Sequence, residues 1–79
     1  MSSLDFDLDS QMAHLESEWR QAYEHSVEAR VDYQALAANP KADANQLDLA
    51  RERMDRAEAV KERIMVRIER LESLLLGQD

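Results

Sequence analysis

The most constraining feature of this sequence is a regular repeat of small and apolar residues in its first half. Nine positions are separated alternately by four and three residues: Leu8, Met12, Leu15, Trp19, Ala22, Ser26, Ala29, Tyr33 and Leu36. This uninterrupted heptad pattern is typical of a helix that packs lengthwise against another helix. We therefore expect a first helix over about residues 8–38.

The end of this first helix is marked more clearly than its start. Ser3, Asp9 and Ser10 are all residue types that cap helix N-termini, so each is a candidate for the first cap. The helix should end near residue 38 because Asn39 precedes Pro40, and a residue before proline is steered out of the helical conformation.

A second helix is predicted over about residues 44–76. Asp43 can accept hydrogen bonds from the first free amides of this helix, and Gln46 can reach back to complete a capping box. Gly77 is a plausible residue to follow its last turn. The turn at 39–43 is short, which favours antiparallel neighbours.

The second helix carries a similar seam with one irregularity. Its members are Leu47, Ala50, Met54, Ala57, Val60, Ile64, Ile68, Leu71 and Leu75. The spacing breaks between Ala57 and Val60, so we expect the register to slip there. The predicted fold is all-α: a single coiled-coil-like antiparallel two-helix hairpin over residues 1–79.

Such a chain needs help to complete a core. It has 79 residues and no cysteine, so no disulfide can stabilise it. Small scaffolds of this kind depend on a metal, oligomerisation or a partner. The N-terminus lacks the basic residues and apolar run of a signal peptide, and no stretch has the ~18 apolar residues of a membrane span. We expect a cytoplasmic chain whose helical bundle is completed by oligomerisation or by a partner.

The net charge of −7 is unevenly distributed. Residues 1–38 carry eight acidic and two basic residues, whereas residues 39–79 carry nine acidic and eight basic residues. This balance disfavours nucleic acid and anionic membrane surfaces, since both are bound through positive charge. A basic protein partner remains open.

The residue patterns of catalysis and cofactor binding are absent from the sequence. His14 and His25 lie eleven residues apart, about 16 Å along a helix, so they cannot share one metal ion. His14 and Glu18 form an i, i+4 pair that lacks a third ligand. The only glycine is Gly77, which excludes a glycine-rich phosphate loop. We expect no cofactor, no metal and no enzymatic activity.

Apolar residues outside the two seams are the main sign of function. Tyr23, Val27 and Val31 recur every four residues on a second stripe, and the second helix is apolar nearly all round at residues 64–68 and 74–76. Singly exposed apolar residues need no partner. A helix that is apolar on several sides is normally buried on several sides. We predict a partner interface formed by Trp19, Tyr23, Val27, Val31, Met65, Val66, Leu74 and Leu76.

The turn region resembles that of a known family. The matching positions are Leu36, Ala37, Asn39 and Pro40, followed by Leu47 and Ala50 in the second helix. Together they resemble the turn of type III secretion needle subunits. In size and layout the chain is also similar to the small co-chaperones that hold needle subunits in the cytosol. This resemblance implies a complex of unlike helical hairpins that blocks premature polymerisation.

Three functions follow from these observations. The first is an adaptor or co-chaperone-like module that binds another helical protein. The second is a self-assembling structural subunit, either a homodimeric four-helix bundle or a component of a secretion apparatus. The third is a small acidic regulator or inhibitor of a basic protein. In all three the partner is a protein or a second copy of the chain.

Overall fold

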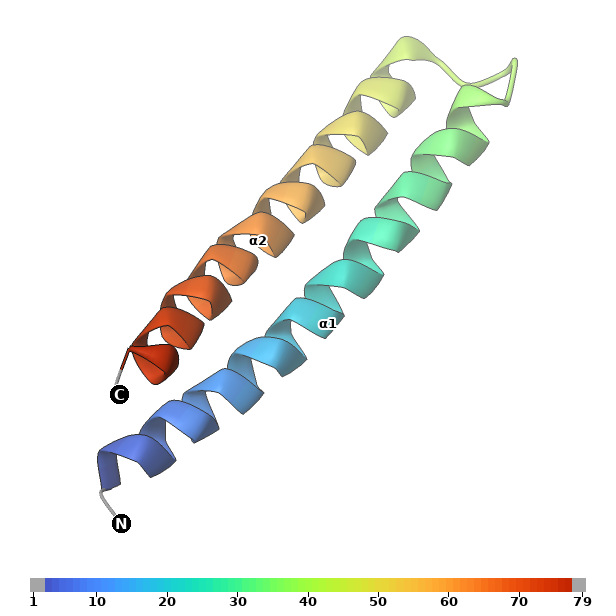
Figure 1. Ribbon diagram of the computed structural model, residues 1–79. Coiled ribbons are helices and arrows are strands. Elements are labelled where there is room, and N and C mark those ends of the chain that lie inside the picture. Colours follow the sequence, from blue (N-terminus) through green and yellow to red (C-terminus); the bar gives the residue numbers. More distant parts are fainter. Residues whose placement is uncertain (1–2, 78–79) are drawn as a thin grey trace.

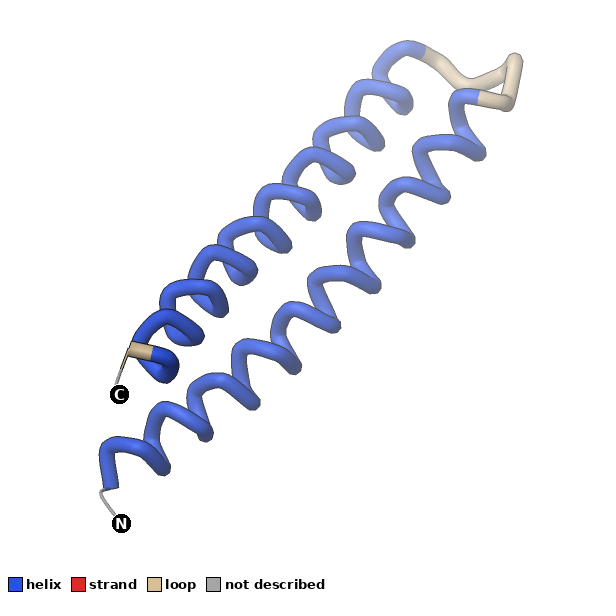
Figure 2. The backbone as a smooth tube through the Cα atoms, in the orientation of Figure 1, coloured by secondary structure: helices blue, strands red, loops and turns tan. Residues whose placement is uncertain are grey.

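The fold is a hairpin of two long helices. The computed structural model describes residues 3–77, with side chains from residue 7 onward. Helix α1 (Ser3–Ala37) and helix α2 (Ala44–Leu76) run antiparallel and side by side (Figure 1). Figure 2 shows the loop that joins them at one end of the molecule, opposite the two described chain ends. With extents of 61 × 16 × 14 Å, the hairpin confirms the predicted all-α architecture.

Helix α1 begins five residues earlier than its seam suggested. It starts at Ser3, so Asp9 and Ser10 lie inside the helix and are not its N-cap. The residue that would cap it lies outside the described part of the chain. Residues 3–8 contain neither glycine nor proline, and their acidic residues suit the positive end of the helix dipole. Nothing therefore stops the helix from extending beyond Leu8.

The turn between the helices is held by local hydrogen bonds. The Ala42 amide donates to the Asn39 carbonyl (3.1 Å), which closes a four-residue turn with Pro40 at its second position. The Asn39 side chain accepts from the Lys41 amide (2.9 Å). Helix α1 ends at Ala37, one residue before the predicted end, so the turn spans residues 38–43.

Both ends of α2 lie where the sequence predicted. The capping box is confirmed: Asp43 Oδ1 accepts from the Gln46 amide (2.7 Å), and Gln46 Oε1 accepts from the Asp43 amide (3.1 Å). At the other end, the Gly77 amide donates to the Ser73 carbonyl (2.8 Å). Gly77 has φ −80°, so it follows the helix without the left-handed conformation that usually favours glycine there.

The seam predicted for α1 faces α2 along its whole length. All nine of its positions are buried or half-buried. Ser26, the single polar member, is the most buried side chain, at 1% exposed. Its hydroxyl donates to the Tyr23 carbonyl in the preceding turn (2.8 Å). Ser26 therefore acts as a small filler between Ala22 and Ala29, where the two helices pack closely.

The predicted seam of α2 is wrong at one position. Val60 is 44% exposed, whereas the Lys61 side chain is only 21% exposed. With Lys61 in place of Val60, the seam alternates by three and four residues from Leu47 to Leu75 without a slip. The aliphatic stem of lysine can cover apolar surface while its amine stays at the edge. The heptad spacing of α2 is therefore continuous when Lys61 is counted as a seam residue, whereas the apolar residues alone show a break.

The largest side chains of the core lie in the half of the hairpin nearest the chain ends. There, the main apolar cluster joins Leu8, Leu15, Ala22, Ile64, Ile68 and Leu71. Toward the turn, the fully buried residues are the small ones: Ser26, Ala29 and Ala50. The core is thus one layer of side chains thick, and both of its long edges meet solvent.

Candidate protein-binding surfaces

The seam divides the hairpin into two long edges, one on each side. Tyr23 and Arg30 each follow a seam residue of α1 by one position, whereas His25 and Asp32 each precede one. At 100° per residue, the two pairs lie on opposite sides of the seam. The contacts across to α2 differ between the two sides, and so do the surfaces that they leave open.

The first side, which we call the aromatic edge, is defined by Trp19, Tyr23, Lys61 and Met65. The rings of Trp19 and Tyr23 stack with centroids 5.4 Å apart and an interplanar angle of 23°. The Lys61 amine from α2 lies 5.7 Å from the Tyr23 ring centroid, within range of a cation–π interaction. Met65 follows Lys61 by one helical turn and is half-buried. These contacts cover the seam from this side.

Ion pairs extend the same edge toward the turn. Glu58 accepts from Arg30 of α1 (3.0 Å) and from Lys61 of α2 (2.9 Å). The hydrogen bond from Lys61 lowers the pKa of Glu58 below its usual value, and the charges of Lys61 and Arg30 add to this effect. Glu58 therefore links the two helices as a carboxylate and holds the seam lysine in place.

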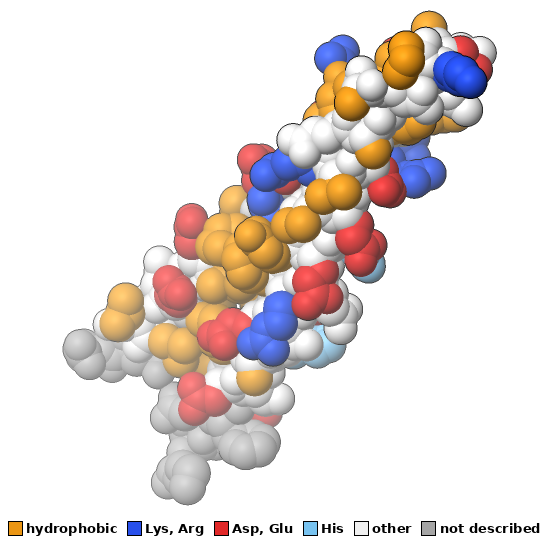
Figure 3. Space-filling model, turned by 90° about the vertical axis from the view of Figure 1, so that its right-hand side faces the viewer, with side chains coloured by type: hydrophobic (Ala, Val, Ile, Leu, Met, Phe, Trp, Pro, Cys, Tyr) orange, Lys and Arg blue, Asp and Glu red, His pale blue; other side chains and the backbone are white. Residues whose placement is uncertain are grey.

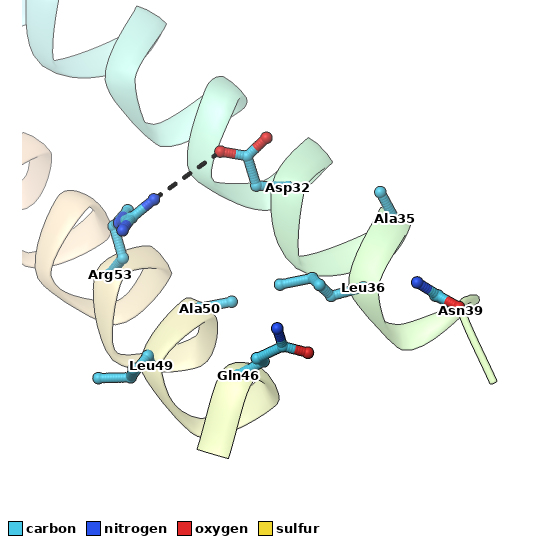
Figure 4. Close-up of a pocket in the computed structure, with 8 residues that line it drawn as sticks. All are labelled: Asp32, Ala35, Leu36, Asn39, Gln46, Leu49, Ala50 and Arg53. Carbon is cyan, nitrogen blue, oxygen red and sulfur yellow. Dashed lines mark ion pairs between the residues drawn. The ribbon is translucent and has the colours of Figure 1, made fainter. Parts of the chain in front are cut away.

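The second side, which we call the groove edge, is defined by His25, Asp32, Arg53 and Val60. A row of shallow hollows follows it from the turn toward the chain ends. The hollow nearest the turn measures about 490 Å³. In its close-up, Leu36 and Ala50 point toward each other between the helices, and Arg53 reaches toward Asp32 (Figure 4).

Few side chains close this groove. The Arg53 and Asp32 side chains approach to 4.0 Å, and both are well exposed, at 71% and 62%. Neighbouring hollows share lining residues. The hollow nearest the turn and the next one along are both lined by Asp32 and Arg53, and this second hollow and the third are both lined by His25. These three hollows are therefore parts of one groove along the seam, with small residues such as Ala29 and Ala57 among its lining, and the fourth hollow follows on the same edge nearer the chain ends.

A third apolar surface winds away from the aromatic edge along α1. Tyr23, Val27 and Val31 are 46%, 38% and 56% exposed. Because a spacing of four advances 40° around a helix, this stripe turns progressively away from α2. Figure 3 shows hydrophobic side chains that run along one face of the molecule and gather near its middle.

The structure divides the eight predicted interface residues among several surfaces. Five of them lie on or next to the aromatic edge: Trp19, Tyr23, Met65, Val27 and Val31. The other three lie elsewhere. Leu74 lines the groove near the chain ends, Val66 lies on the outward face of α2, and Leu76 is 77% exposed in the last turn.

Val66 has a different environment from the valines of α1. It lines a shallow hollow together with Arg63, Arg67 and Arg70, all from α2. Glu62 lines this hollow too, so its charged lining is three arginines and one glutamate, although the chain as a whole is acidic. A single apolar patch that includes Val66 and Val27 does not exist, because the two side chains lie on opposite sides of the hairpin.

The basic residues of α2 pair both within their own helix and across to α1. Glu52 and Arg56 pair within α2 (3.6 Å), as expected from their spacing. Arg51 instead reaches across to α1: it donates to the Tyr33 hydroxyl (3.4 Å) and lies 5.9 Å from the centroid of that ring. Arg53 of α2 also approaches Asp32 of α1 to 4.0 Å.

Other kinds of site find little support within residues 3–77. His14 Nε2 lies 2.8 Å from Glu18 Oε1, but within that range no three His, Asp or Glu side chains gather where a metal ion could bind. Neither described helix is both long enough and apolar enough to cross a membrane.

The residues missed by sequence reasoning are Lys61, Arg30 and Glu58, and their signal was their position beside or within the heptad seam.

Comparison with known proteins identifies no relative. No family model matches the chain, and neither a curated protein nor a solved structure matches it significantly. The resemblance to type III secretion hairpins therefore stays a prediction. Any function has to be argued from the surfaces described above.

Proposed function

We propose that this chain is a non-enzymatic adaptor that binds another helical protein through the aromatic edge and the adjoining stripe of α1. The observation that carries this proposal is the continuous row formed by Trp19, Tyr23, Val27 and Val31. The Trp19 ring lies in the seam and the Tyr23 ring stacked on it lies beside the seam, and the two valines lead onto the open face of α1.

The chemistry of this row suits a helical partner. An amphipathic helix docks through apolar residues spaced three and four apart, and the row offers apolar side chains every four residues along one helix. Tryptophan and tyrosine are enriched among the residues that contribute most to binding. Trp19 is already held by its stack on Tyr23, so little side-chain freedom remains to be lost on docking.

A co-chaperone-like role is the finer form of this proposal. In that role, the exposed face of α1 covers an apolar helix of a subunit that otherwise polymerises. The likeness of residues 36–50 to the turn of secretion needle subunits supports a partner that is itself a helical hairpin. The proposed binding uses only the apolar row and requires no metal ion.

A matched pair of substitutions tests the proposal. Val27→Glu places a charge on the row, and Val66→Glu makes the same change on the outward face of α2, where the valine is similarly exposed (45% against 38%). Tagged chains are used to capture partners from the cells that make the protein, and helicity is measured by circular dichroism. We expect Val27→Glu to lose a partner that Val66→Glu and the unaltered chain retain.

Two results would count against the proposal. One is a partner that binds Val27→Glu as well as it binds the unaltered chain. The other is loss of the same partner from Val66→Glu, which would move the interface to the outward face of α2. Helicity must be retained in both variants, as expected for substitutions at exposed positions.

A further inference from the structure

The groove edge separates charge by helix. Among the residues that line its hollows, every aspartate and glutamate comes from α1 and every arginine comes from α2, while His25 of α1 lies among the acidic residues. The acidic wall contains Glu18, Glu28 and Asp32, and the basic wall contains Arg53, Arg67 and Arg70. An acidic wall and a basic wall thus face each other along one open groove.

Such a surface is complementary to itself in one orientation. A twofold axis parallel to the long axis of the hairpin places the acidic wall of one copy over the basic wall of the other. A twofold axis across the hairpin places acid over acid and base over base, which is repulsive. Both arrangements make every neighbouring helix antiparallel, as in a four-helix bundle with short loops, so the charges favour the first.

The groove also has the size and lining that a dimer requires. A face 61 Å long and 16 Å wide offers on the order of 1,000 Å² per copy, above the roughly 800 Å² per partner of a standard interface. Apolar side chains lie exposed along it, including Val60 (44%), Leu74 (59%) and Leu49 (63%). Pairing two grooves would bury these residues and convert the thin seam into a bundle core.

We propose that two copies of this chain dimerise groove to groove, with their turns at the same end. In this dimer α1 of each copy packs against α2 of the other. The aromatic edges and the stripes of α1 remain on the outside, free to bind another protein. This inference does not rest on the proposed adaptor function, because it uses the opposite edge of the hairpin.

The position of the turns distinguishes the two symmetric arrangements. The chain has no cysteine, so Lys41→Cys carries a single spin label at the exposed turn. Double electron–electron resonance then measures the distance between the two labels of a dimer. We expect about 20–35 Å, the width of a bundle built from helices ~10–12 Å across. A distance near the 61 Å length of the hairpin, or a monomer without a dipolar signal, would overturn the proposal.

Charge reversal tests the complementarity itself. One variant combines Arg53→Glu with Arg67→Glu, and a second combines Glu18→Lys with Asp32→Lys. By symmetry each alters four contacts of the dimer, so each alone should weaken dimerisation at least about tenfold. Mixing the two variants should restore a dimer, because the walls of one are then mostly acidic and those of the other are mostly basic.

Arg20→Glu is the matched control, since Arg20 is exposed on α1 away from the groove. It should leave the dimerisation constant unchanged within about twofold, as expected for an exposed residue outside the interface. Equal weakening by Arg20→Glu, or no recovery in the mixture, would overturn the proposal. Dimers that persist in both reversed variants would overturn it too. If dimerisation is lost while the aromatic edge still captures its partner, the adaptor proposal is unaffected.

Discussion

The two long edges of the hairpin are built from the same two helices and yet differ in how they are closed. On the aromatic edge, Tyr23 stacks on Trp19 and lies under Lys61, and Glu58 joins that lysine to Arg30. On the groove edge, the described ion pair between the helices is the 4.0 Å approach of Asp32 and Arg53. One edge is covered by the chain's own side chains, and the other is open.

This difference shows that a heptad seam alone does not decide what a hairpin binds. The seam fixes which residues face inward, and it does so equally for both edges. The residues one position before or after the seam decide whether an edge is closed, apolar or charged. In this chain they close the aromatic edge and leave the groove edge open.

The seam beneath both edges should show the largest effect. Ile68 is 7% exposed within the main apolar cluster. We expect Ile68→Ala to lower the free energy of unfolding by about 2–5 kcal/mol because it leaves a cavity that both helices share. Urea denaturation followed by circular dichroism measures this change. Val66→Ala on the outward face is the control and should stay within about 0.5 kcal/mol. Equal effects would mean that the seam is placed wrongly.

Close approach of the helices in the middle of the seam can be tested by adding volume. Ser26 is 1% exposed and lies between Ala22 and Ala29. We expect Ser26→Leu to destabilise the hairpin by about 1–3 kcal/mol, since the larger side chain forces the helices apart. Ser17→Leu adds the same group at an exposed position and should have little effect. A neutral Ser26→Leu would show that the helices do not pack closely there.

The closed and open edges should respond differently to loss of a side chain. We expect Tyr23→Ala to lower the free energy of unfolding by about 1–2 kcal/mol, because it removes the stack on Trp19 and the contact with Lys61. Val60→Ala on the groove edge should cost less than about 0.5 kcal/mol in the monomer. Both are measured by denaturation at high dilution, where a dimer is dissociated. A reversed order would contradict the difference between the edges.

The smallest effect should come from acid, through Glu58. Its pKa is lowered in the folded chain, so its contribution to stability is present above the ordinary value of 4.5 and is lost as the pH falls through the lowered one. Glu58→Gln should therefore lose less stability than the unaltered chain between about pH 7 and about pH 3. Glu62→Gln, at an exposed position of the same helix, is the control. Identical acid sensitivity of Glu58→Gln and the unaltered chain would exclude this role.

Much of the fold could be predicted because heptad spacing and helix caps are local signals. Asp43 and Gln46 form the predicted capping box, and Ser26 fills the seam as its position suggested. Lys61 was missed because charged residues were left out of the apolar pattern, although a long aliphatic stem can occupy a seam position. The early start of α1 was missed because the seam begins at Leu8 and the few residues before it are too short a stretch to show a period.

The candidate surfaces were harder to predict than the seam. The sequence pattern predicts one interface from the exposed apolar residues, but Val27, Val66 and Leu74 lie on three different surfaces. Exposure alone does not say where a residue lies around a helix relative to the seam. The segregation of acids and bases across the groove depends on both helices at once. It therefore becomes visible only when the hairpin is assembled.

The most direct test of the difference between the edges is a dilution series followed by amide chemical shifts in NMR. We expect concentration-dependent shifts at His25, Asp32, Arg53 and Val60 on the groove edge. The indole N–H of Trp19, the only tryptophan, should stay unchanged. Shifts centred on Trp19 and Tyr23 would contradict the assignment of the open edge. A spectrum that does not change with concentration, combined with the tumbling time of a monomer, would contradict it as well.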